Sequence, residues 1–289
     1  MVKDGVKSGR ADVQGNAHSL QSIELLKELH ILTREGKLNQ DSRRKLKQVD
    51  HLYQFIEPLL KEIPRDLKLV DHGAGKSYLG FILYDRFFKD LGGNAHIFGI
   101  ESREDLVEKS RQLAARLGFT GMSFLHETVA ASITSGQLPD TVDLVTALHA
   151  CDTATDDAIR FALGKQARFI VLVPCCQAEV AAVLNKNKGR ALKDPLTEIW
   201  RHPIHTREFG AQVTNVLRCL QLESHGYQVT VTELVGWEHS MKNELIIARR
   251  QNLPGRRTTE RLRELLQTLG LEELQGRFFV DQAIEPEIT

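Results

Sequence analysis

Short runs of β-forming residues alternate with helical segments through the middle of the chain, and this alternation limits the possible folds more than any other feature. It is typical of a doubly wound α/β protein, in which a parallel sheet has helices on both faces. The predicted strands are 67–71, 96–101, 121–126, 143–149, 169–174, 228–234 and 244–248. The predicted helices between them are 76–91, 103–117, 153–164 and 207–225.

The last two predicted strands differ from the others in how they are connected. Only residues 235–243 separate them, whereas a parallel pair needs a crossover of about a dozen residues or more, usually a helix. We therefore expect these two strands to form an antiparallel hairpin at one edge. The sequence thus predicts a seven-stranded, mostly parallel sheet with an antiparallel terminal hairpin.

The segments that flank the alternating region have their own composition. Residues 1–17 mix glycine, serine and charged residues with almost no large apolar side chains, which predicts a disordered tail. Apolar residues at helical spacing then predict two helices, the second with Asp41 or Ser42 as its N-cap. A last helix is expected after a cap at Thr258 or Thr259. The expected parts are a tail (1–17), a helical extension (18–63), a main domain (64–250, with an insertion at 177–206) and a C-terminal helix with its tail (251–289).

Charge and cysteine content limit the partners and the compartment. The chain has 38 basic and 38 acidic side chains, so a nucleic acid would have to be held by a local patch. Its four cysteines form no CxxC pair and are too few for a disulfide-stapled secreted domain. Neither a signal peptide nor a run of about 18–20 apolar residues is evident. We expect a soluble, cytoplasmic protein.

The first predicted strand leads into a glycine-containing turn, Val70-Asp71-His72-Gly73-Ala74-Gly75-Lys76-Ser77. Glycines let the backbone turn sharply and approach a ligand closely. A phosphate-binding P-loop would need another glycine at the position of Val70, and a dinucleotide fingerprint would need one at Tyr78. The turn therefore favours a nucleoside ligand without a pyrophosphate.

Glu101 ends the second predicted strand, 26 residues beyond Gly75. This spacing is comparable to that of the ribose-binding acid in Rossmann-like sites, where a carboxylate accepts hydrogen bonds from both ribose hydroxyls. A tight turn with an unrelated surface glutamate is the alternative interpretation. Together, the turn, the acid and the terminal hairpin resemble the Rossmann-like class I methyltransferases that depend on S-adenosylmethionine.

Two further segments narrow this resemblance. They are Ala147-Leu148-His149-Ala150-Cys151-Asp152, at the fourth predicted strand, and Val173-Pro174-Cys175-Cys176-Gln177, at the end of the fifth. Over about residues 40–250 the chain resembles the methyltransferase domain 32 group, which includes methyltransferase-like proteins and a tRNA 2′-O-methyltransferase branch. It departs from the group at Asp152, where relatives usually carry glycine. It also lacks the zinc-finger cysteines and histidines of the tRNA branch, so that substrate does not carry over.

The resemblance implies a binding site for S-adenosylmethionine. The glycine turn would pass beneath the methionine part, Glu101 would hold the ribose, and Asp71 would orient the amino group through water. The contact to adenine would come from just after the third predicted strand, where the chain offers His126, Glu127 and Thr128, and we expect Glu127 to make it. The residues expected to bind the cofactor are Asp71, Gly73, Ala74, Gly75, Glu101, Glu127 and Ala147.

The same resemblance places the acceptor atom at the end of the fourth strand. Methyl transfer is an in-line displacement, so aligning the two reactants lowers much of its barrier, and a base is needed only where the acceptor must lose a proton. His149 is either that base or a residue that hydrogen-bonds the strand end. The cysteines are either nucleophiles, as in RNA cytosine-5 methyltransferases, or small buried residues. The candidate catalytic residues are His149, Cys151, Asp152, Cys175 and Cys176.

The sequence says less about the substrate. Basic residues in the first turns of the second helix and near the terminal hairpin, with the basic insertion, favour an RNA acceptor together with the resemblance. The candidate substrate contacts are Lys45, Lys47, Lys242 and Asn243. A small-molecule or protein methyltransferase, and a nonenzymatic nucleic-acid-binding module, stay open as alternatives. No metal site is expected, because adjacent cysteines do not have chelating spacing.

Overall fold

The structure is a computed structural model that describes residues 23–29, 31–33, 40–91, 93–148, 152–174, 177–187, 195–234, 244–252 and 255–279. The strands are β1 (Lys68–His72), β2 (His96–Glu101), β3 (Met122–His126), β4 (Leu144–Leu148), β5 (Phe169–Val173), β6 (Tyr227–Glu233) and β7 (Glu244–Arg250). The α-helices are α1 (Ile23–Glu28), α2 (Gln40–Lys61), α3 (Tyr78–Arg86), α4 (Glu104–Leu117), α5 (Val129–Ser132), α6 (Thr153–Gly164), α7 (Glu179–Lys186), α9 (Pro203–Ser224), α10 (Arg256–Thr268) and α11 (Gln275–Phe278). Short 3-10 helices are η2 (Phe88–Asp90), η3 (Pro195–Trp200) and η4 (Glu272–Leu274).

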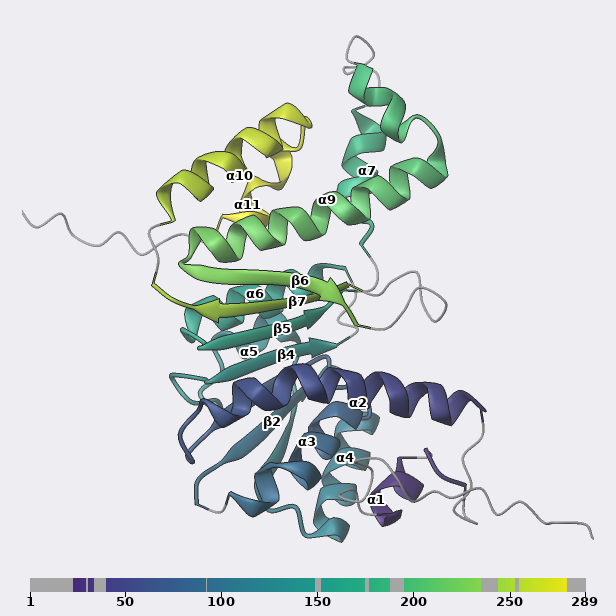
Figure 1. Ribbon diagram of the computed structural model, residues 1–289, viewed down its shortest axis with the longest axis vertical. Coiled ribbons are helices and arrows are strands. Elements are labelled where there is room, and N and C mark those ends of the chain that lie inside the picture. Colours follow the sequence, from purple (N-terminus) through teal and green to yellow (C-terminus); the bar gives the residue numbers. More distant parts are fainter. Residues whose placement is uncertain are drawn as a thin grey trace, which may run out of the picture.

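The strands form one seven-stranded sheet in the order β3-β2-β1-β4-β5-β7-β6. Strands β1 to β5 run parallel, and β7 pairs antiparallel with both β5 and β6. Helices cover both faces of this sheet (Figure 1). The predicted Rossmann-like fold with its antiparallel terminal hairpin is confirmed. Because β7 lies between β5 and β6, the hairpin places β6 at the edge.

The central strands are apolar along their whole length because both of their faces are covered. In β5 all five residues are buried. Phe169, Val171 and Val173 pack on the side of α2 and α3, whereas Ile170 and Leu172 pack on the side of α6. This alternation is the two-residue period of a strand, and it divides the core into two layers, one on each face of the sheet.

A third hydrophobic cluster lies away from the sheet, among α7, η3, α9, α10 and α11. Trp200 is only 4% exposed and stacks on Phe209, with ring centroids 5.1 Å apart. In Figure 1 these helices lie together at one end of the molecule, and α7 stands on the side toward which the arrowheads of β4 and β5 point. The insertion and the C-terminal helix therefore share one helical layer, packed around α9.

Several details of the helices differ from the sequence predictions. Helix α2 begins at Gln40, so Asp41 and Ser42 lie inside it and neither is its N-cap. Helix α10 begins at Arg256 with Gly255 as its cap, three residues before Thr258, the nearer of the two predicted caps, Thr258 and Thr259. The short helices α5 and α7 were not predicted, since the sequence offers four and eight residues for them. Within the described residues, no helix combines the length and the apolar character that crossing a bilayer requires.

Candidate functional site

The turn between β1 and α3 has the left-handed backbone that its glycines allow. Gly73 and Gly75 have φ angles of 62° and 58°, and Ser77, which precedes α3, has 52°. Residues with a Cβ avoid this region, so glycine is favoured at the first two positions. The backbone N–H of Ala74 donates to the carbonyl of Ile100 at 3.0 Å. The turn is therefore fixed to the end of the neighbouring strand β2.

Glu101, the last residue of β2, is joined to this turn. Its Oε2 accepts a hydrogen bond of 2.7 Å from the backbone N–H of Gly75. Its Oε1 accepts from the backbone N–H of Arg103 at 3.0 Å and from the Arg103 side chain at 3.1 Å. Burial alone would raise the pKa of Glu101, but the hydrogen bonds from Arg103 and Gly75 outweigh it and hold the pKa below its usual value. The carboxylate is therefore ionised at neutral pH.

Asp71 lies in β1 beside β4, at the register position of Thr146. Its side chain is 2% exposed, and Oδ1 accepts a hydrogen bond of 2.6 Å from the Thr146 hydroxyl. Burial raises the pKa of Asp71 to about 7, and the Thr146 hydroxyl opposes that rise. Ala147, the next residue of β4, is also buried. A carboxyl group that titrates near neutrality therefore lies next to the glycine turn.

Glu127 follows β3, and its backbone N–H donates to the carbonyl of Glu101 at 3.2 Å. Its Oε1 accepts from the Ser135 hydroxyl at 2.9 Å and from Nε2 of Gln137 at 3.3 Å. Its Oε2 is buried and has no hydrogen-bond partner among the described residues. A buried acceptor without a partner carries a desolvation cost that a ligand donor would offset. Glu127 therefore has a buried carboxylate oxygen without a described partner, and its backbone is joined to the end of β2.

These groups fit the nucleoside that the sequence predicts. The Oε2 atom of Glu127 can accept a hydrogen bond from an exocyclic amine, and the ionised carboxylate of Glu101 can accept hydrogen bonds from a pair of hydroxyls. A Cβ built on Gly75 would come within 3.8 Å of the Arg103 guanidinium and 4.0 Å of Glu101 Oε2. These are ordinary van der Waals distances, so the left-handed φ of Gly75, and not a lack of space, favours glycine at this position. Asp71, Gly73, Ala74, Gly75, Glu101, Glu127 and Ala147 all lie at the ends of β1 to β4 or in the residues that follow them.

His72 belongs to the same motif, but it lies in the core. It is fully buried and packs edge-on against Phe161, with ring centroids 4.5 Å apart. Burial lowers the pKa of His72 to about 3, so the ring is neutral. Neither ring nitrogen has a hydrogen-bond partner among the described residues.

Of the candidate catalytic residues, only Asp152 lies within the described part. It has φ 50° and ψ −122°, a conformation that glycine adopts far more readily, which agrees with the glycine usual among relatives. Its Oδ1 accepts a hydrogen bond of 3.2 Å from the backbone N–H of Ala178. The candidates that lie outside the described residues are His149, Cys151, Cys175, Cys176, Lys242 and Asn243. Lys45 and Lys47 lie in α2, and their side chains are outside the described part as well.

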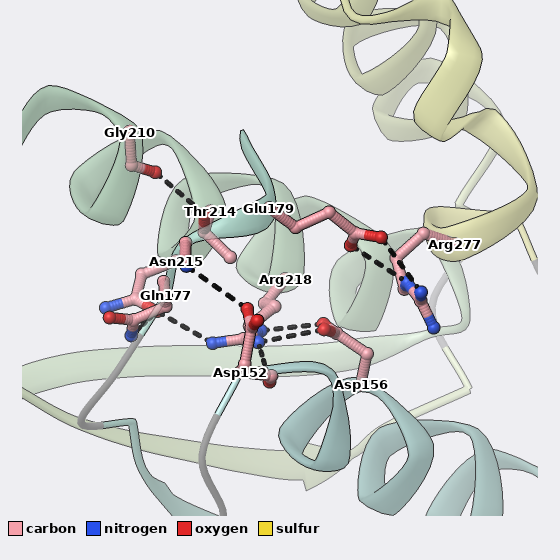
Figure 2. A network of polar contacts seen from close by, with 10 residues as sticks. Asp152, Asp156, Gln177, Glu179, Gly210, Thr214, Asn215, Arg218 and Arg277 are labelled. Atoms are coloured by element: carbon pink, nitrogen blue, oxygen red, sulfur yellow. Dashed lines mark hydrogen bonds and ion pairs between the residues drawn. The ribbon is translucent and has the colours of Figure 1, made fainter. Parts of the chain in front are cut away.

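A buried polar network next to Asp152 was missed by sequence reasoning. Arg218 of α9 forms a two-point ion pair with Asp156 of α6, at 2.7 and 2.9 Å (Figure 2). Asn215, one turn earlier in α9, accepts hydrogen bonds from both Arg218 and Gln177. No sequence signal connects these residues, because Asp156 and Arg218 are 62 positions apart in different helices.

The described cations of the insertion and of the start of α9 are largely paired with acids. Lys186 pairs with Glu273 at 2.8 Å, Arg201 with Glu198 at 3.1 Å, and Arg207 with Glu208 at 2.9 Å. His202 and His205 are exposed, with their rings 5.4 Å apart. Trp200 is buried, so it is not available for base stacking. In the described part of the chain, no cluster of histidine, cysteine and acidic residues could hold a metal ion.

Comparisons with known proteins give a family model and several distant relatives. Residues 44–183 match a family model described as a methyltransferase domain. Two curated relatives are named glutathione S-transferase C-terminal domain-containing protein. The relative from Bos taurus is 24% identical over 233 residues, which cover 74% of this chain and 34% of that protein. The one from Mus musculus is 22% identical over 232 residues, with the same coverage. The chain thus spans about a third of the length of these relatives.

Solved structures with a similar fold include two methylating enzymes. One is magnesium protoporphyrin IX methyltransferase from Synechocystis PCC 6803 with bound SAH, at 15% identity and a TM-score of 0.45, covering 79% of this chain and 93% of that one. The other is an rRNA methylase from Streptococcus thermophilus, at 9% identity and a TM-score of 0.44, covering 69% of this chain and 95% of that one.

Proposed function

Residues 44–183 match a methyltransferase domain, and from this premise we propose that the chain is a class I methyltransferase that transfers the methyl group of S-adenosylmethionine to RNA. The observation that carries the cofactor site is the pair of acids at the ends of β2 and β3. Glu101 is ionised and fixed to the glycine turn, and Glu127 has a buried oxygen without a described partner. An adenosine offers a ribose diol and an adenine amine as donors, and these two acids supply acceptors that support the proposed site.

Each residue at the proposed site has a defined task. Gly73, Ala74 and Gly75 let the backbone pass close to the methionine part, and Asp71 orients the amino group. Glu101 accepts from the ribose hydroxyls, and Glu127 accepts from the adenine amine. Ala147 adds an apolar wall at the end of β4. The cofactor supplies an electrophilic methyl group on a positively charged sulfur.

The proposed catalytic groups follow β4 and β5. Because the reaction is an in-line displacement, the main task of the protein is to align the acceptor with the sulfonium. His149 accepts a proton where the acceptor must lose one. Cys151, Cys175 and Cys176 are nucleophiles only in the alternative cytosine-5 mechanism. Asp152 contributes through the conformation of the segment after β4.

RNA is proposed as the acceptor mainly because the sequence resembles a methyltransferase group that includes an RNA-modifying branch. Exposed His202 and His205 stand at the start of α9, and Lys45, Lys47, Lys242 and Asn243 remain candidate contacts. The pairing of Lys186, Arg201 and Arg207 with acids favours a second candidate function, methylation of a small molecule or a protein, because paired cations attract phosphates weakly.

We also propose a domain organisation for the chain and the cytoplasm as its cellular compartment. We assign catalysis to residues 64–250, with 18–63 as a helical extension, 1–17 as a tail, and 251–289 as a helix that packs beside the insertion 177–206, followed by a tail. The packing of α10 and α11 against α9 supports this last assignment. Cys219 is a free thiol, in keeping with the reducing cytoplasm.

Calorimetric titration of S-adenosylhomocysteine tests the cofactor site, with ATP and NAD as parallel ligands. We expect S-adenosylhomocysteine alone to bind. Tritiated methyl transfer from S-adenosylmethionine to total cellular RNA then tests the acceptor, and RNase treatment should remove the label. A protein that binds S-adenosylhomocysteine but labels only RNase-resistant material would contradict the RNA acceptor and favour a small-molecule or protein substrate. A protein that binds none of the three ligands would favour a nonenzymatic module.

A further inference from the structure

Arg218 is a fully buried arginine whose hydrogen bonds reach well beyond its ion pair. Its Nε and one terminal nitrogen hold both oxygens of Asp156. That same terminal nitrogen also donates to the backbone carbonyl of Asp152 at 2.8 Å. The other terminal nitrogen donates to Oδ1 of Asn215 at 3.2 Å. The guanidinium therefore joins α6, α9 and the residue that precedes α6 (Figure 2).

Asn215 extends the network to two further segments. Its Oδ1 also accepts a hydrogen bond of 3.0 Å from Gln177, which follows β5. Its Nδ2 donates to Glu244, the first residue of β7, at 2.6 Å. Asn215 is 6% exposed and Gln177 is 8% exposed, so these bonds are sheltered from water. One turn of α9 thus holds polar groups from three different chain segments.

Asp152 adds a direct link between two of these segments. Its carbonyl is bound by Arg218, and its carboxylate accepts from the backbone N–H of Ala178, just before α7. Its positive φ is costly for a residue with a Cβ, and the surrounding bonds maintain it. The turn after β4 is therefore tied both to α9 and to the start of α7.

The position of this network along the chain suggests its purpose. Asp152, Gln177 and Glu244 directly follow residues 149–151, 175–176 and 235–243, which carry the candidate catalytic and substrate residues. A buried ion pair contributes little net stability, because desolvation of the charges offsets their attraction. Buried charged groups of this kind are more readily explained by the single arrangement of side chains and chain segments that their hydrogen bonds enforce.

We propose that Arg218 and Asn215 are positioning residues of methyl transfer. By holding Asp152, Gln177 and Glu244, they fix the C-terminal end of each of the segments 149–151, 175–176 and 235–243, which we call the acceptor-side segments. The proposal rests on the proposed function, since it assigns the acceptor to these segments. The cofactor groups Glu101 and Glu127 are not part of this network.

The test compares Arg218→Lys with Arg277→Lys. Lysine keeps the charge but cannot make a two-point pair and also reach Asp152 and Asn215. Arg277 is a matched control, because it forms a two-point pair with Glu179 that does not involve Asp152, Gln177 or Asn215. We expect Arg218→Lys to lower kcat of methyl transfer to RNA about 100-fold, as misplacement of reacting groups does. Its KM for S-adenosylmethionine and its affinity for S-adenosylhomocysteine should stay unchanged. Arg277→Lys should match the wild type in all three quantities.

Amide hydrogen exchange gives a second readout that needs no acceptor. The Ala178 amide should exchange faster in Arg218→Lys, because its acceptor Asp152 is no longer held, and at the wild-type rate in Arg277→Lys. Wild-type exchange at Ala178, or wild-type kcat, in folded Arg218→Lys would overturn the proposal. If the wild-type protein labels no RNA, the proposed RNA acceptor is wrong. Amide hydrogen exchange at Ala178 then tests the positioning role of Arg218 by itself. If Arg218→Lys fails to fold, Gln177→Met, which removes one hydrogen bond from Asn215, replaces it, with a lower kcat at unchanged KM for S-adenosylmethionine as the expected result and a wild-type kcat as the result that overturns the proposal.

Discussion

The backbone N–H of Gly75 donates a hydrogen bond of 2.7 Å to Oε2 of Glu101, although the two residues are 26 positions apart. This bond joins the turn after β1 to the acid at the end of β2. Arg103 holds the other carboxylate oxygen. The carboxylate is thus oriented before any ligand binds, which reduces the conformational entropy that is lost on binding.

Replacing Glu101 with alanine should weaken the binding of S-adenosylhomocysteine. Charge-assisted hydrogen bonds are worth about 1.5–3 kcal/mol, which corresponds to roughly a 10- to 150-fold higher Kd. Calorimetry measures this change, and Glu104→Ala, on the exposed first turn of α4, serves as the control. Equal affinity in the Glu101→Ala variant and the wild type would contradict the site.

Gly75→Ala should lose both stability and affinity. A left-handed conformation costs an alanine about 1–2 kcal/mol, so Tm should fall by a few degrees. A backbone change at this position also displaces the Gly75 N–H that orients the Glu101 carboxylate, which should lower the affinity. Gly118→Ala separates the two effects, because Gly118 has φ 68° and open space around it. It should lower Tm similarly and leave the Kd for S-adenosylhomocysteine unchanged. A Kd that changes equally in both variants would show that backbone strain alone is responsible.

The vacant oxygen of Glu127 predicts discrimination at the adenine amine. S-inosylhomocysteine carries a carbonyl in place of that amine, so it would leave Glu127 Oε2 facing an acceptor. We expect the wild type to bind S-adenosylhomocysteine much more tightly than S-inosylhomocysteine, and Glu127→Ala to bind the two more equally. A preference that survives the substitution would place the adenine elsewhere.

Asp71 predicts a pH dependence of stability. Its pKa is about 7 in the folded protein, against 3.8 as the ordinary value, so the folded state binds a proton more tightly than the unfolded state. The free energy of unfolding should therefore fall as pH rises from about 4 to about 7, by up to about 1.4 kcal/mol per pH unit from this group. Asp71→Asn removes this contribution, so its stability relative to the wild type should increase across that window.

Urea unfolding at a series of pH values checks this prediction. Thr146→Val is the companion variant, because the Thr146 hydroxyl opposes the rise in the pKa of Asp71. Without it the fall in stability should continue to higher pH. Parallel pH profiles for the wild type and Asp71→Asn would mean that Asp71 does not titrate in this range.

Cys175→Ser and Cys176→Ser should each retain methyl transfer, because in-line displacement needs no covalent intermediate. Tritium transfer to RNA is the measurement. Complete loss in one variant, together with a trapped protein–RNA adduct in the wild type, would instead establish a cysteine nucleophile.

The fold could be predicted because local patterns determine it. Strand β2 has the predicted bounds, 96–101, and β5 was recognised because five apolar residues precede Pro174. The glycine turn and Glu101 could be found for the same reason, since a fixed spacing marks them. The network around Arg218 has no such mark. In sequence Arg218 is one cation in a helix, and only the packing of α9 against α6 places it beside Asp156.

The order of the strands has a consequence for how the chain is made. Strand β7 is the last to be synthesised, yet it lies between β5 and β6. While β6 emerges from the ribosome, its hydrogen-bonding groups and its Val231, 51% exposed even in the finished sheet, have no neighbouring strand. Unpaired strands of this kind attract one another in nascent chains. Strand β6 therefore stays without its partner strand until β7 has been synthesised and has paired with both β5 and β6.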